Sequence, residues 1–163
     1  MTFDLSKKKI MKPLIVLLIS FVIASVVIVY TKKSYDFSLS ARIAMAVMLS
    51  FTAIGHFIFT KGMALMLPGI FPLKTFIIHL SGILELVIAI GLLVPRFKTI
   101  SGWALIILLI LILPANINAA IHQINYQKGS FDGPGLSYLW FRIPLQVFFI
   151  IWTFLSSITS FKV

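Results

Sequence analysis

Five long apolar runs are the feature that most constrains this chain. They cover residues 13–30, 39–59, 75–94, 99–121 and 136–158. A helix of about 20 apolar residues is long enough to cross roughly 30 Å of hydrocarbon. Because the runs are continuous rather than alternating, and because lipid offers the backbone no hydrogen-bond partner, helices are favoured over barrel strands. The sequence therefore predicts an all-α integral membrane protein with five transmembrane helices.

Charged residues are few, and most of them lie where apolar runs end. Only 11% of the residues are charged and 60% are hydrophobic, and the mean hydropathy of +1.10 is far above that of soluble domains. The net charge of +10 suggests nucleic acid at first sight, but the cations flank the runs as head-group anchors do. We therefore expect the lipid bilayer, and no nucleic acid, as a partner. A hydrolase or kinase would need motifs that are missing.

The chain has no cysteine, which removes several kinds of chemistry. Thiol–disulfide exchange, thiolate metal ligation and disulfide bonds are excluded, so a redox role would need a bound cofactor or a partner protein. No second ligand accompanies His56 at a metal-binding spacing, and we expect no metal site.

The first apolar run is predicted to be an uncleaved anchor. Lysines precede it as in a signal peptide, but it is about 18 residues long, longer than the usual h-region, and Tyr30-Thr31-Lys32 is no small-residue cleavage site. We expect residues 1–38 to hold a basic tail and this helix, and residues 39–163 to hold the other four helices. The Lys and Arg bias of the loops predicts a cytoplasmic N-terminus, in the plasma or inner membrane.

Polar side chains inside the last four runs give the strongest indication of function. Antiparallel threading gathers them in one half of the membrane, where an ionisable group is costly enough to need a partner or a purpose. Toward the other half the runs are nearly all Leu, Ile and Val, which argues against a proton or solute path, and Arg42 is expected to snorkel to the head groups. The clustered residues are His56, Glu85, Asn116, Arg142 and Gln146.

Glu85 is expected near the bilayer centre, about ten residues or roughly 15 Å beyond Thr75. A lone carboxylate there must take up a proton or find a cation. His56 lies on the semi-polar face of its helix, and we predict that Glu85 and His56 are catalytic residues that handle protons. Arg142 is the expected ion-pair partner of Glu85. The alternatives are a purely structural role for the pair and snorkelling of Arg142 to phosphate.

Asn116, Arg142 and Gln146 are predicted to bind a ligand. Arg142 and Gln146 are spaced i and i+4, so they share one side of their helix. Pro114 removes a backbone hydrogen bond and tends to kink the helix just before Asn116, and it exposes a carbonyl that a side chain or water must satisfy. Hydrogen bonding between helices is the alternative role for Asn116.

Residues 60–74 combine apolar side chains with prolines. Pro68 and Pro72 forbid a long regular helix, and Met63 and Met66 are among the apolar residues of the segment. We expect the segment to lie in the membrane interface as a cap over the bundle. It serves either as a functional lid or as a connecting loop that dips into the head groups.

Several short motifs follow one another over about residues 40–155. They are Gly55-His56-Phe57, Pro68…Pro72, Gly82-x-Leu84-Glu85, Gly91…Pro95, Pro114-Ala115-Asn116-Ile117 and Arg142-x-Pro144-x-Gln146. Their order resembles the DoxX-like membrane protein family. The resemblance implies a four-helix membrane bundle to which the helix at 13–30 is an addition. It matches His56, Glu85, Asn116, Arg142 and Gln146 to the family motif. Because the namesake is a small subunit linked to thiosulfate:quinone oxidoreductase, it also implies a quinone and a redox partner.

Two functions follow from these observations. In the first, the bundle binds a lipophilic molecule, a quinone being the candidate cofactor, or serves a membrane redox system together with a membrane or peripheral redox protein. In the second, the chain is an assembly or interaction subunit without chemistry. In that case the Glu85–Arg142 pair locks the helices together, the segment 63–73 contacts a partner, and further copies of the chain are candidate partners.

Overall fold

The computed structural model describes residues 11–159, and all regular elements in that range are helical. Residues 1–10, which make up most of the predicted basic tail, and residues 160–163 lie outside the described residues. An isolated bridge between Asn125 and Ser130 closes a turn in the loop before the last helix. The elements are α2 (Lys12–Lys32), α3 (Phe37–Ile58), α4 (Thr60–Met66), α5 (Lys74–Leu93), α6 (Lys98–Ile121), α7 (Ser137–Thr153) and the π-helical turn η1 (Phe154–Ile158) that continues α7.

Five helices are long and apolar enough to cross a membrane, as predicted. They are α2, α3, α5, α6 and the continuous α7–η1 segment Ser137–Ile158. Their ends lie within two residues of the predicted runs because the stop signals are local. Asp36, for example, caps α3 by accepting the backbone N–H of Leu39 at 2.8 Å, and Pro95 follows the end of α5. The all-helical, multi-pass architecture expected from the sequence is therefore present.

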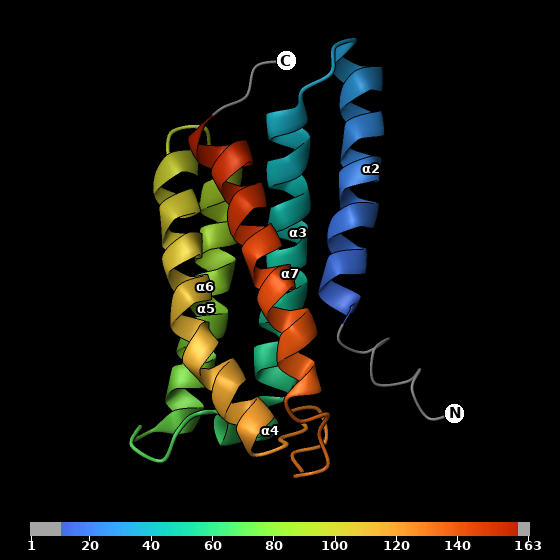
Figure 1. Cartoon of the computed structure of the whole chain (residues 1–163). Helices are drawn as coiled ribbons and strands as arrows, with labels where there is room; N and C mark the ends of the chain where they lie inside the picture. Colours follow the sequence, from blue (N-terminus) through green and yellow to red (C-terminus); the bar gives the residue numbers. More distant parts are fainter. Residues whose placement is uncertain (1–10, 160–163) are drawn as a thin grey trace, which may run out of the picture.

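The helices α3, α5, α6 and α7 lie side by side, and α2 lies at the edge beside α3 (Figure 1). The short helix α4, the loop 67–73 and the loop 122–136 lie at one end of the molecule, which we call the α4 end. The α2–α3 and α5–α6 connections lie at the opposite end (Figure 1). Antiparallel threading thus places the first residues of α5 and α7 and the last residues of α3 and α6 at the α4 end.

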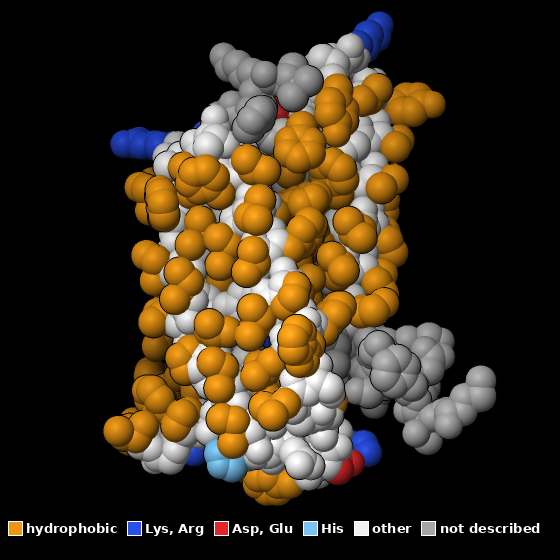
Figure 2. Space-filling model, viewed as in Figure 1, with side chains coloured by type: hydrophobic (Ala, Val, Ile, Leu, Met, Phe, Trp, Pro, Cys, Tyr) orange, Lys and Arg blue, Asp and Glu red, His pale blue; other side chains and the backbone are white. Residues whose placement is uncertain are grey.

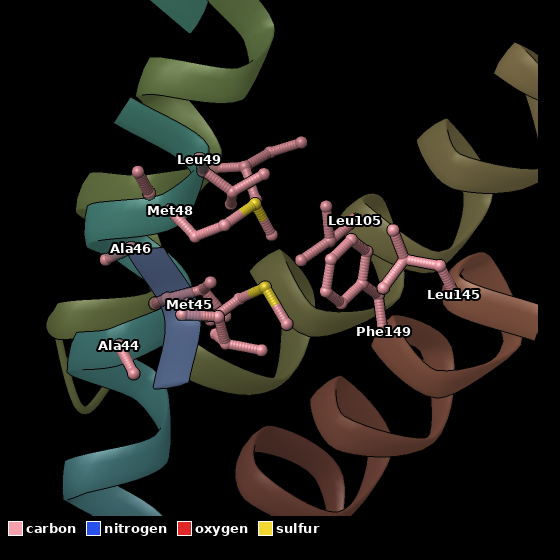
Figure 3. Packing of buried hydrophobic residues seen from close by; sticks show 12 residues of the cluster. Ala44, Met45, Ala46, Met48, Leu49, Leu105, Leu145 and Phe149 are labelled. Atoms are coloured by element: carbon pink, nitrogen blue, oxygen red, sulfur yellow. The ribbon is translucent and has the colours of Figure 1, made fainter. Parts of the chain in front are cut away.

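A cluster of buried apolar side chains fills the middle of the bundle. Met45, Met48 and Leu49 of α3 face Leu105 of α6 and Phe149 of α7 (Figure 3). In lipid, such a core is stabilised mainly by close packing and dispersion, because the surrounding acyl chains are as apolar as leucine. The same cluster separates the polar groups at the two ends of the molecule.

Small residues allow three helices to approach closely at the opposite end. A Cβ atom on Gly102 of α6 would lie 2.9 Å from the Cβ of Ser157, and one on Gly91 of α5 would clash with the hydroxyl of Ser101. Contacts of this kind are typical of packed membrane helices. They join α5 and α6 near their connecting turn.

Arg42 corrects the expectation for the opposite end. It does not snorkel but is buried, donating hydrogen bonds to the carbonyls of Ser38 at 3.3 Å and Leu92 at 3.4 Å. The carbonyl of Leu92 belongs to the last turn of α5, where helical carbonyls lack internal partners and attract cations. This end is therefore not purely aliphatic. Its other buried polar residues are Ser38, Ser40, Ser101, Thr153, Ser156 and Ser157.

The outer surface fits a lipid environment. Apolar side chains cover most of the visible face, and Lys, Arg and Asp side chains lie mainly toward its two ends (Figure 2). Exposed large apolar residues such as Val22, Ile90 and Leu111 come from different spanning helices. Charged groups at the ends of such a surface are typical of anchoring at the membrane interface.

The segment 60–74 caps the α4 end, as its prolines predicted. It forms α4 and then turns back through the loop 67–73, which Lys74 holds by donating to the carbonyl of Leu67 at 2.8 Å. Asn118 of α6 donates to the carbonyl of Met66 at 2.9 Å. Gly62 is required here, because a side chain would overlap the backbone of Tyr126 in the loop 122–136.

Candidate functional site

The helices α3 and α5 bring His56 and Glu85 into contact. The His56 Nε2 atom lies 3.3 Å from Glu85 Oε1, and both side chains are largely buried, with 12% and 8% of their surfaces exposed. Gly82, one turn before Glu85, makes the approach possible: a Cβ atom there would lie 2.9 Å from the Cβ of His56. The predicted role of both residues in one polar site therefore has a geometric basis.

Two hydroxyl groups complete this polar cluster, and sequence reasoning did not select them as site residues. The Thr52 hydroxyl donates to Glu85 Oε2 at 2.8 Å, and the Ser81 hydroxyl lies 2.9 Å from His56 Nδ1. Thr52 stands four residues before His56, and Ser81 four residues before Glu85, so each pair shares a helix face. That spacing is the signal by which they could have been found.

One proton shared between His56 and Glu85 satisfies every group in the cluster. With the proton on His56, both ring nitrogens donate, Nε2 to Glu85 and Nδ1 to Ser81, whose own hydroxyl donates to the Ile78 carbonyl at 2.8 Å. With the proton on Glu85, the carboxyl group donates to Nε2 and the Nδ1 proton still reaches Ser81. The pair has no net charge in either arrangement, which limits the cost of burying it in lipid.

The cluster opens into a cavity of about 420 Å³. Its walls come from α3, α5, α6 and α7, its floor comes from α4 and the loop 122–136, and Lys12 of α2 lies at its edge. Most of the lining is aliphatic or aromatic. This size and character are typical of sites for small lipophilic molecules. Thr52, His56, Ser81 and Glu85 all line it.

The cavity reaches the outer surface at exposed lining residues of α5 and α6, and also of α3, where Phe51, Ile54 and Ile58 are exposed. Leu80 and Leu84 of α5 and Leu111 of α6 line it and are also exposed, by 42%, 42% and 68%. The two helices are held together at the opposite end, whereas α6 bends in its second half, which contains Pro114 (Figure 1). In a membrane this opening faces the acyl chains.

Asn116 and Arg142 line the same cavity from α6 and α7. Asn116 is only 1% exposed, and its Oδ1 accepts from the hydroxyl of Tyr138 at 3.2 Å, while its buried Nδ2 group has no hydrogen-bond partner among the described residues. Arg142 is half-buried. The cavity thus has a second polar region, made of hydrogen-bond donors.

The expected ion pair between Glu85 and Arg142 is not formed. Within residues 11–159, Glu85 pairs with His56, and Arg142 makes no hydrogen bond or ion pair. The reason is geometric: His56, from the neighbouring helix α3, occupies the position beside the carboxylate.

Gln146 does not line the cavity, although it shares a helix with Arg142. Its side-chain amide donates to the carbonyl of Leu109 in α6, next to Ile110, whose carbonyl Pro114 cannot satisfy. Its Oε1 is buried without a partner among the described residues. Gln146 therefore contacts the bent helix, and its predicted ligand contact has no support in this geometry.

Tyr126 lies at the floor of the cavity, outside the spanning helices. Its pKa is raised, first because burial disfavours the phenolate and then because of Tyr138, whereas Arg142 and a hydrogen bond from Gln127 act in the opposite direction. The phenol therefore stays neutral and presents a hydroxyl to the cavity. The positive charge of Arg142, which lines the same cavity, favours the ionised form of Tyr126.

No group of three His, Asp or Glu side chains in the described part of the chain is arranged to hold a metal ion. The carbonyl oxygens of a quinone need hydrogen-bond donors, and its ring and tail need an apolar wall. The lining has mostly apolar side chains and the Asn116 amide, which has no partner among residues 11–159.

Comparison with known proteins yields one match. Residues 45–157 match the model of a family described as a domain of unknown function (DUF8561). The matched part begins within α3, runs through α7 into η1, and contains the whole polar cluster. No curated protein and no solved structure matches the chain.

Proposed function

The chain belongs to that family, which carries no assigned activity, and we propose that it is a multi-pass membrane protein that binds a lipophilic molecule in its cavity. The head of the molecule lies among the polar side chains that line the cavity, and its tail extends between α5 and α6 to the lipid. The single observation that carries the proposal is the Glu85–His56 pair at the wall of an otherwise apolar cavity. A buried ionisable pair beside open space is typical of a functional site.

In this proposal Glu85 and His56 hold one exchangeable proton at the cavity wall. The proton moves between Oε1 and Nε2 across 3.3 Å without creating net charge. Thr52 and Ser81 orient the two partners, and Asn116 supplies a donor for an oxygen atom of the ligand. A ligand that takes up or gives off protons is thus the kind that this wall suits.

A quinone is the candidate cofactor. Bound, it would supply two carbonyl oxygens and a redox couple, and the chain without cysteine would need a membrane or peripheral redox protein as the source of electrons. We further propose a DoxX-like bundle for residues 39–163 and a location in the plasma or inner membrane with a cytoplasmic N-terminus. The order of the motifs supports the DoxX-like bundle, and the lysines of the α4 end support the cytoplasmic N-terminus.

The test is purification of the chain from native membranes followed by mass spectrometry of the bound lipids and quinones. We expect one lipophilic species to copurify with the wild type in about stoichiometric amount and to be lost in Glu85→Gln. Asp132→Asn, which removes an exposed acid outside the cavity, is the control and should keep the ligand. Equal retention by Glu85→Gln and the wild type would refute the role of the pair.

An assembly subunit without chemistry ranks second. It was expected to use a Glu85–Arg142 lock and a contact surface on the segment 63–73. That lock is missing among residues 11–159, and Met63 and Met66 line the cavity. If the subunit hypothesis is right, Glu85→Gln lowers the amount of folded protein and no specific lipophile is found with the wild type.

A further inference from the structure

Arg142 is a cation at the cavity wall that has no counter-charge beside it among residues 11–159. It lies in the first turns of α7, it is half-buried, and it makes no hydrogen bond or ion pair with any residue in the range 11–159. A guanidinium carries five N–H donors and stays charged. At membrane depth such a group needs an oxygen partner.

The described acids cannot provide that partner, because each is engaged elsewhere. Glu85 is bound by His56 and Thr52. Asp132 is bound by Lys128 at 3.1 Å, and Asp36 caps α3 at the opposite end of the molecule.

Asn116 lines the same cavity and has a buried donor without a partner among residues 11–159. The residue is 1% exposed, its oxygen is occupied by Tyr138, and its Nδ2 group is buried and unpaired among the described residues. A buried donor left unpaired destabilises the folded state, so its presence beside an open cavity points to a ligand oxygen.

We propose that the lipophilic molecule is not the quinone considered above but an amphiphile with an anionic, oxygen-bearing head, a carboxylate or a phosphate. The inference rests on the proposed function, because it assumes that the cavity takes a lipophilic molecule. Arg142 holds the head with charge-assisted hydrogen bonds and the Asn116 amide donates a further one. The acyl tail leaves through the opening between α5 and α6, past Leu84 and Leu111.

The charges around the cavity favour an acidic head over a neutral one. If the Glu85–His56 pair holds one shared proton, as in the proposed function, it has no net charge. Arg142 then leaves the lining positive, and Lys12 at its edge adds a second positive charge. In a cleft with apolar walls the attraction for an anion is strengthened, because the low dielectric concentrates the field.

The experiment measures binding to the full chain in nanodiscs of phosphatidylcholine, by native mass spectrometry. The probes are oleate, oleyl alcohol, dioleoylphosphatidylglycerol and decylubiquinone. Oleate and oleyl alcohol share a tail and differ in the charge of the head. The variants are Arg142→Gln, Asn116→Leu and the control Arg96→Gln, which removes an exposed arginine from the α5–α6 turn.

We expect oleate to bind the wild type more tightly than oleyl alcohol does. Arg142→Gln should lower the affinity for oleate by about tenfold or more, which is the loss expected for a charge-assisted hydrogen bond. Asn116→Leu should lower the affinity for oleate less, and Arg96→Gln should leave this affinity unchanged. Stronger binding of phosphatidylglycerol than of oleate would support the inference and identify a phospholipid as the source of the head.

Two results would overturn the inference alone. They are equal binding of oleate to Arg142→Gln and the wild type, and equal or tighter binding of oleyl alcohol or decylubiquinone than of oleate to the wild type. Because the second comparison needs no variant, it decides the matter even if Arg142→Gln does not fold. Binding of none of the four probes would instead refute the proposed function.

Discussion

Gly82 is the residue that lets the histidine of one helix reach the acid of the next. A methyl group there would lie 2.9 Å from the Cβ of His56 and 3.2 Å from the ring of Phe57. Overpacking of this kind costs about 1–3 kcal/mol. We therefore expect Gly82→Ala to lower the thermal unfolding temperature in detergent and to separate α3 from α5 at the polar cluster.

Gly69 provides a matched control for this substitution. A Cβ atom there meets nothing within 4 Å, so Gly69→Ala should leave the unfolding temperature nearly unchanged. Equal effects of the two variants would show that the close approach at Gly82 does not limit stability.

Asp132 illustrates a local electrostatic effect in the loop 122–136. Its pKa is lowered, first by the hydrogen bond from Ser130 and then by Lys128. The ionised carboxylate thus stabilises the loop above its ordinary pKa of 3.8, and this stabilisation is lost as the pH falls through the lowered value. Ser130→Ala should raise the pKa of Asp132, measured by NMR titration of its side-chain carbon, and an unchanged midpoint would contradict the assignment.

At the scale of elements, α6 is bent in the half that lines the cavity, and Gln146 of α7 donates a hydrogen bond to this helix. Gln146→Leu removes the hydrogen bond to the Leu109 carbonyl but also removes a buried, unpaired oxygen. We expect a small loss of stability, about 1 kcal/mol or less, as is typical of hydrogen bonds between membrane helices. Binding of lipophilic probes should not change, because Gln146 does not line the cavity. A tenfold loss of binding would return Gln146 to the site.

The helices themselves could be predicted from sequence, because apolar length, Asp36 and the prolines are local signals. The contacts between side chains of different helices were harder to predict. The i and i+4 spacing put Arg142 and Gln146 on one side of α7, yet a guanidinium and an amide on one side can still face different surroundings. The partner of Glu85 depended on which helix packs beside α5, and the rotation of α3 that presents His56 is fixed by packing at Gly82. No local pattern contains that information.

At the scale of the whole molecule, polar groups occupy both ends and an apolar core separates them. Arg42 and Ser38 satisfy backbone carbonyls at the opposite end. Met45, Leu105 and Phe149 fill the space between that end and Glu85. Water and protons therefore have no continuous polar route through the described bundle. This favours a site that opens sideways to lipid over a transmembrane path.

The absence of cysteine makes the proposed orientation directly testable. A single cysteine at Phe131 in the loop 122–136 marks the α4 end, and one at Tyr35 in the α2–α3 connection marks the opposite end. Both residues are exposed, by 65% and 48%, and neither substitution alters the charges that guide insertion. With a cytoplasmic N-terminus, Tyr35→Cys reacts with a membrane-impermeant maleimide in intact cells, whereas Phe131→Cys reacts only after permeabilisation. The wild type gives no signal, and the reverse pattern would place the polar cavity in the outer half of the membrane.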